Sequence, residues 1–140
     1  MTYIKNLGCL LIIFLIGISA CKNDPQTKPG DLVLGDTAVI KIHETLTNTA
    51  NGISILMDSV LNDSRCPVDV ECVWAGNAKV RFFFKSNIDE IKFSLNTTLM
   101  PRDTAINGYK ISLLYLLPFP ISTHSIPLDE YHANILIQKN

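Results

Sequence analysis

The sequence predicts an all-β protein, with one antiparallel β-sandwich of immunoglobulin-like size or a small barrel. Two observations support this fold class. Short runs of residues alternate between apolar and polar side chains, as in strands with one face on a core and the other in water. Segments rich in Asn, Thr, Asp, Gly and Pro separate these runs, and no run has the repeat of an amphipathic helix.

The clearest strand pair is expected at residues 78–84 and 91–95. In the first run, apolar residues alternate with Lys79, Arg81 and Lys85, and the second run repeats the pattern. The turn-forming residues 86–89 separate the runs, so we expect a hairpin. The other strands are expected at residues 39–42, 53–61, 109–117 and 133–138, which gives six or seven strands in all.

Two of these strands contain apolar residues out of phase with their neighbours. Leu114 and Leu116 interrupt the alternation of the strand at 109–117, which predicts that this strand is central and buried on both faces. Phe83 lies on the charged side of its strand. Either the long loop expected at residues 121–130 covers it, or it belongs to an exposed partner patch.

The first 20 residues have the pattern of a secretory signal peptide. They carry a single charge, Lys5, followed by an apolar run over residues 7–18. This run is shorter than the ~20 residues that span a bilayer core, so a permanent transmembrane helix is disfavoured.

The charge of the chain disfavours nucleic acid as a partner. The net charge is −1, and neither positive nor negative residues are gathered in a block.

The signal segment ends in Ile18, Ser19, Ala20 and Cys21, which resembles the lipobox of bacterial lipoproteins. This resemblance implies cleavage before Cys21 and lipidation of its thiol, which would anchor the chain to a membrane. The polar residues 21–31 then form a flexible tether and residues 32–140 the folded domain. The residue after Cys21 is Lys22, whereas an aspartate at this position marks inner-membrane retention in similar lipoproteins. We therefore expect the cell envelope, at the outer membrane, facing either the periplasm or the exterior.

Cys66 and Cys72 are predicted to form a disulfide, because an exported chain meets an oxidising compartment. The alternative is a metal site, but a spacing of five residues matches no usual Cys-x-x-Cys pair and no histidine is nearby in sequence. Trp74 follows on the same side of an extended strand as Cys72 and is positioned to pack over the disulfide.

Residues 63–80 resemble a motif of a widespread group of small bacterial secreted and lipoprotein domains, Asp-Ser-Arg-Cys-Pro…Cys-Val-Trp-Ala-Gly. The resemblance supports a single domain and implies no activity. Arg65 has two interpretations: an exposed contact that offers its guanidinium fork, or a local ion pair with an acid such as Asp69 or Glu71. We place the expected partner contact, to a protein or a glycan, at Arg65 and Trp74.

The sequence favours a non-catalytic binding or structural domain over an enzyme. It contains no nucleophile elbow and no phosphate-binding glycine loop, and its three histidines are scattered, so we expect no cofactor and no metal. Calcium binding is a further possibility for four acidic residues: Asp58, Asp63, Asp69 and Glu71. It is disfavoured, because they do not form the loop of closely spaced acidic residues that such sites use. Two alternatives stay open: a protease inhibitor that presents Arg65, and a small hydrolase that uses Asp69 and Glu71.

Overall fold

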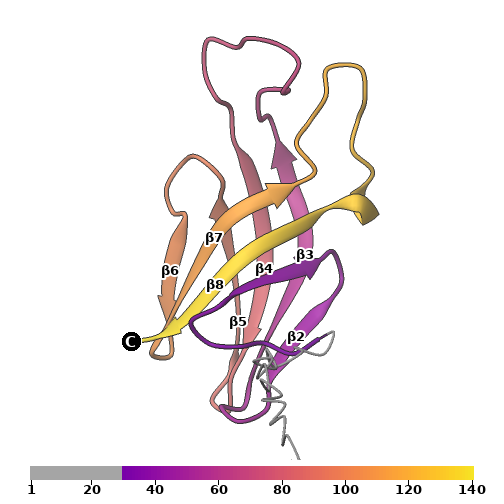
Figure 1. Cartoon of the computed structure of the whole chain (residues 1–140). Helices are drawn as coiled ribbons and strands as arrows, with labels where there is room; N and C mark the ends of the chain where they lie inside the picture. The colour runs from indigo at the N-terminus through magenta and orange to yellow at the C-terminus, as the bar shows by residue number, and fades with distance from the viewer. Residues whose placement is uncertain (1–29) are drawn as a thin grey trace, which may run out of the picture.

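The computed structural model describes residues 30–140, which form two antiparallel four-stranded sheets packed face to face (Figure 1). The predicted signal peptide, Cys21 and most of the tether lie outside the described residues. Gly30 and Asp31, which the sequence assigns to the tether, already contact the domain: the Gly30 carbonyl accepts a 2.8 Å hydrogen bond from the Thr47 N–H. Within residues 30–140, no helix is long and apolar enough to cross a membrane.

The first sheet has the strand order β1-β8-β7-β6 and the second the order β2-β3-β4-β5. The strands are β1 (Thr37–Lys41), β2 (Thr45–Asn48), β3 (Ile53–Asp63), β4 (Ala78–Lys85), β5 (Glu90–Asn96), β6 (Asp103–Ile106), β7 (Tyr109–Leu117) and β8 (His132–Lys139), with a 3-10 turn η1 (Leu128–Glu130) before β8. The fold is therefore the predicted all-β sandwich. The expected hairpin is β4 with β5, paired from Lys79 opposite Asn96 to Lys85 opposite Glu90.

The sequence did not indicate β2 and β6. Each has only four residues, and neither contains a repeated apolar alternation. Both become strands by pairing with a longer neighbour, β2 with β3 and β6 with β7.

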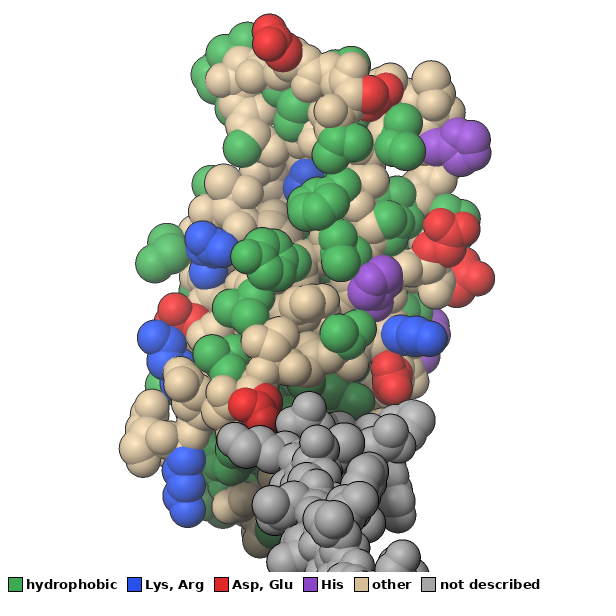
Figure 2. Space-filling model, in the orientation of Figure 1, with side chains coloured by type: hydrophobic (Ala, Val, Ile, Leu, Met, Phe, Trp, Pro, Cys, Tyr) green, Lys and Arg blue, Asp and Glu red, His purple; other side chains and the backbone are tan. Residues whose placement is uncertain are grey.

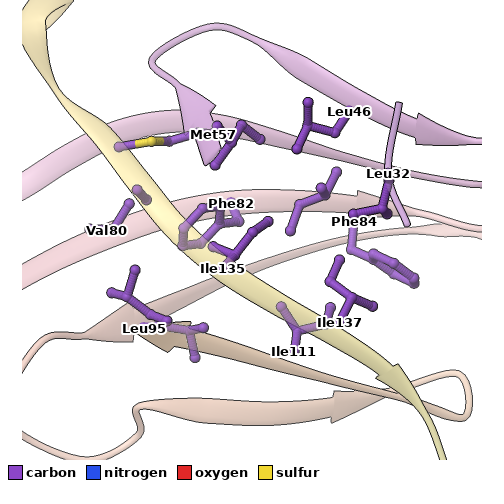
Figure 3. Close-up of a cluster of buried hydrophobic side chains, with 14 of the residues drawn as sticks. Leu32, Leu46, Met57, Val80, Phe82, Phe84, Leu95, Ile111, Ile135 and Ile137 are labelled. Atoms are coloured by element: carbon purple, nitrogen blue, oxygen red, sulfur yellow. The ribbon is translucent and has the colours of Figure 1, made fainter. Parts of the chain in front are cut away.

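The core lies between the two sheets (Figure 3). Met57, Phe82 and Phe84 of the second sheet face Ile111 and Ile135 of the first, and all are fully buried. Each such side chain contributes about 1.5–3 kcal/mol relative to exposure in water. These residues occupy alternate positions on their strands, as the sequence pattern predicts.

The β7 strand corrects one expectation. Leu113 pairs with Ile135 but Tyr115 pairs with Asn134, so the strand contains a bulge that inserts one extra residue at Leu114. The extra residue reverses the alternation. Leu116 therefore points into the core, while Tyr115 is 59% exposed. The out-of-phase leucines result from a bulge rather than burial on both faces. The central position of β7, between β6 and β8, is confirmed.

Phe83 is half-buried on the outer face of the second sheet. It lines a shallow hollow with Leu56 and Lys85 of the same sheet, and no residue of the loop at 121–130 lines this hollow. Of the two alternatives, cover by that loop is therefore wrong, and side chains of the neighbouring strands border Phe83 instead.

Candidate partner-binding end of the sandwich

Three connections meet at one end of the sandwich, which we call the loop end. They are the β3–β4 loop (residues 64–77), the β5–β6 loop (residues 97–102) and the β7–β8 loop (residues 118–131). The β3–β4 and β7–β8 loops extend furthest (Figure 1). The described chain begins at the other end. Gly30 is hydrogen-bonded to Thr47, and Thr47 pairs with Ser54 at the start of β3. Ser54 in turn pairs with Lys85, the residue of β4 furthest from the β3–β4 loop.

The β3–β4 loop has a narrow, hydrogen-bonded base. The Ser64 N–H donates to the Asn77 carbonyl at 2.8 Å, and the Cys66 N–H donates to the Ala75 carbonyl at 2.9 Å. Gly76 makes this approach possible: its φ is +68°, and a Cβ there would lie 1.8 Å from the Ser64 carbonyl oxygen. The predicted disulfide between Cys66 and Cys72 closes the loop above this base, with the two Cα atoms 5.9 Å apart.

Arg65 sits at the root of this loop and is only 9% exposed. Its Nε and Nη2 donate to the two carboxylate oxygens of Asp63, at 2.8 and 2.6 Å. Nη2 also donates to the Pro118 carbonyl at 2.9 Å, and Nη1 to the Leu116 carbonyl. Arg65 thus joins the end of β3 to the end of β7 in the opposite sheet. Of its two predicted roles, the structure shows the ion pair, with Asp63 rather than Asp69 or Glu71.

Tyr131, the last residue of the β7–β8 loop, completes this buried cluster. Its hydroxyl donates to Asp63 Oδ2 at 2.9 Å. Burial raises the pKa of Asp63, but hydrogen bonds from Arg65 and Tyr131 outweigh this effect and hold the pKa below its usual value. Burial, together with the bond to Asp63, raises the pKa of Tyr131 to about 12. The hydrogen bonds of this cluster therefore hold the ends of β3, β7 and the β7–β8 loop together.

Asp69 links the tip of the β3–β4 loop to the β7–β8 loop. Its carboxylate accepts hydrogen bonds from the Ser122 N–H at 2.8 Å and from the Ser122 hydroxyl at 2.5 Å. These bonds lower the pKa of Asp69. The Val68 N–H donates to the Pro120 carbonyl at 3.0 Å nearby. The two longest loops are therefore bound to each other at their tips as well as at their roots.

Asn77 attaches the third loop. Its side-chain oxygen accepts hydrogen bonds from the backbone N–H groups of Thr98 and Leu99, at 3.1 and 3.2 Å. Its side-chain nitrogen donates to Asn96 at 3.0 Å. No sequence pattern indicated this role, because the partners are separated by about twenty residues in the chain.

The β3–β4 loop presents large apolar side chains to solvent. Val73 is 89% exposed, Trp74 is 79% exposed and Val68 is 66% exposed. The sequence had suggested that Trp74 packs over the disulfide, but its side chain projects into solvent. Hydrophobic side chains gather with acidic ones at this uppermost end (Figure 2). Between Cys66 and Asn77 the only charged residues are Asp69 and Glu71.

The acidic residues considered for calcium do not converge. Asp58 pairs with Arg81, while Asp63 and Asp69 have the partners described above. Among residues 30–140, no three His, Cys, Asp or Glu side chains are grouped so that they could hold a metal ion. Each carboxylate of the three instead fixes a strand or a loop.

The chain matches no protein-family model, no curated protein and no solved structure. Its function is therefore inferred from the geometry of the loop end.

Proposed function

We propose that this chain is a lipid-anchored protein of the cell envelope whose β-sandwich is a non-catalytic binding module, with the β3–β4 loop as its contact with a partner. The observation that carries the proposal is the exposure of Val73 and Trp74 on this loop. Folded monomers rarely expose contiguous large apolar side chains without a use for them, and tryptophan is enriched among residues that dominate binding energy.

The rigidity of the loop supports the same function. The disulfide, the Arg65 cluster and the bonds from Ser122 to Asp69 hold the loop before any partner arrives. A preorganised loop loses little conformational entropy on binding, so more of the contact energy contributes to affinity. In this proposal Arg65 positions the loop, and Trp74 makes the contact.

The position of the loop fits an anchor at Cys21. The described chain begins at the opposite end of the sandwich (Figure 1), so an anchor on the N-terminal side does not join the domain next to the loop end and leaves that end free for a partner. The outer membrane is the proposed location. With Arg65 buried, the loop presents Val73 and Trp74, so no observation specifically favours the protease-inhibitor alternative.

Metabolic labelling with an alkyne analogue of palmitate tests the anchor. The full chain is expected to incorporate the label in bacterial cells, and Cys21→Ala is expected to abolish it. Cys9→Ala is the matched control, because Cys9 lies within the predicted signal peptide and should leave labelling unchanged. Label retained in the Cys21 variant would contradict lipidation. Protease treatment of intact cells then separates a surface domain, which is digested, from a periplasmic one, which is protected.

Photo-crosslinking in cells tests the binding surface. A photoreactive amino acid replaces Trp74 in the full chain, and Ile88 serves as the control because it is 80% exposed in the β4–β5 turn at the other end. A discrete adduct is expected from position 74 and not from position 88. Cys66→Ser should weaken the adduct by loosening the loop. Equal adducts at both positions, or none at position 74, would argue against the proposal.

A further inference from the structure

A hollow of about 270 Å³ lies below the β3–β4 loop, separate from the exposed tip. It is bordered by the β5–β6 loop, the bulged part of β7 and the start of the β7–β8 loop. Its lining contains two arginines, two threonines and two aromatic residues but no acidic residue: Arg65, Arg102, Thr97, Thr98, Tyr115 and Phe119, with Cys66, Ala75, Leu114 and Leu116. Basic and hydrophobic side chains surround a depression below the uppermost loops in Figure 2.

Arg102 supplies the hollow with a positive charge that is not neutralised. Its side chain is exposed, and among the residues that the structure describes no acidic group pairs with its guanidinium. The backbone holds it in place, because the Leu113 N–H donates to the Arg102 carbonyl at 2.9 Å beside the β7 bulge. A guanidinium presents a planar fork of donors that matches a carboxylate.

Arg65 contributes differently, from the interior. Four of its five N–H groups are bonded to Asp63, Leu116 and Pro118. One Nη1–H has no protein acceptor within residues 30–140, so it is available to donate to an acceptor bound in the hollow that Arg65 lines. Because Asp63 neutralises its charge, Arg65 offers a ligand only a hydrogen-bond donor. Arg102 offers a ligand its positive charge.

The aromatic residues make the other wall. The β7 bulge turns Tyr115 outward, so that this residue is 59% exposed where a regular strand would have buried it. Phe119 is 52% exposed, and its ring lies 5.9 Å from the Arg65 guanidinium carbon. An apolar group of a ligand can pack on these rings while its acidic group meets the arginines.

We propose that this hollow binds a carboxylate that carries an adjacent apolar group, with Arg102 as the main recognition residue. The volume is slightly below the range of drug-sized pockets, about 300–1,000 Å³, so it accommodates one acidic group and one side chain rather than an extended molecule. Two sources offer this chemistry: the C-terminus of a peptide or protein chain, and a free small aromatic acid.

The test is an NMR titration of the ¹⁵N-labelled full chain in detergent with three probes: acetyl-Ala-Phe, its C-terminal amide, and phenylacetate. Acetyl-Ala-Phe is expected to shift the amide signals of Thr97, Thr98 and Arg102. The C-terminal amide should not shift these signals, because it lacks the negative charge. It also serves as the control for partitioning into detergent, which it shares with the acid. Tighter binding of the peptide than of phenylacetate would identify a chain terminus as the source, and equal binding a free acid.

Arg102→Gln is expected to weaken binding roughly tenfold, the effect of losing one charge-assisted contact. Lys110→Gln is the matched control, since Lys110 is an exposed cation outside the hollow and should leave affinity unchanged. The proposal is overturned if neither acid shifts these signals, if the amide binds as well as the acid, or if the two variants behave alike. Because the tip residues play no part in this titration, its outcome is independent of crosslinking at position 74.

Discussion

Replacing Arg65 with methionine should destabilise the domain by about 3–5 kcal/mol, the range for removing one partner of a buried ion pair. The side chains of Arg65 and Asp63 are 7% and 11% exposed, so the variant leaves a buried carboxylate without its counter-charge. It also leaves the Leu116 and Pro118 carbonyls without the donor that joins the two sheets. Methionine retains an unbranched apolar chain, so the loss measures the guanidinium more than a cavity.

Two other ion pairs of the same sheets provide the scale. Lys110 and Asp103 are 3.7 Å apart and about half exposed, and such a pair contributes about 0–1 kcal/mol. Arg81 and Asp58 are 34% and 26% exposed, which places their contribution between the two cases. The predicted order of loss is therefore Arg65→Met first, Arg81→Met second and Lys110→Met last.

The assay is urea unfolding of the full chain at pH 7, followed by circular dichroism under non-reducing conditions. The double variant Arg65→Met with Asp63→Asn should recover part of the lost free energy, because no unpaired charge remains buried. A loss of less than about 1 kcal/mol for Arg65→Met would refute the reasoning, because it would show that the pair behaves like an exposed one.

Four further predictions concern the same end of the sandwich. Gly76→Ala should lower the unfolding temperature sharply, because its Cβ would clash with the Ser64 carbonyl, whereas Gly108→Ala, at φ +80° in open space, should cost only about 1 kcal/mol. Stability should fall as the pH drops below about 4 through the lowered pKa of Asp63, since that carboxylate stabilises the fold only while ionised, and Asp63→Asn should flatten this decline. Stability should also fall as the pH rises from about 10 towards 12, where the unfolded chain ionises its tyrosine before folded Tyr131 does, and Tyr131→Phe should remove this loss. A reductant should lower the free energy of unfolding by about 2 kcal/mol in the native chain but not in Cys66→Ser, and an unchanged value would contradict a stabilising disulfide.

The alternation of apolar residues was sufficient to place most of the strands. The period of two in β4 and β5 marked both the strands and the core face, because a strand with one buried face needs this pattern in any sandwich. The alternation failed to predict strands that form by pairing with a longer neighbour and have no apolar pattern of their own. β2 and β6 are too short to show a period, and the β7 bulge changed the meaning of Leu114 by adding one residue to the count.

At the loop end, the sequence identified the disulfide but not the arrangement around it. Cys66 and Cys72 were paired correctly, because an exported chain meets an oxidising compartment and, apart from Cys21, no other cysteine follows the predicted signal peptide. Arg65 was left between two roles, because its partners Leu116 and Pro118 lie about fifty residues away in the other sheet. Local sequence does not show which backbone carbonyl groups of the opposite sheet a guanidinium will contact.

The sequence by itself determined the longer strands, the disulfide and the motif of residues 63–80, because these depend on local spacing and on side-chain type. Only the tertiary structure decided that Arg65 is buried, that Trp74 is exposed, and that Arg102 and Tyr115 border one hollow. The physical reason is that burial and contact are properties of two sheets brought together. Loops distant in the chain become neighbours only when the core between Phe82 and Ile135 is packed.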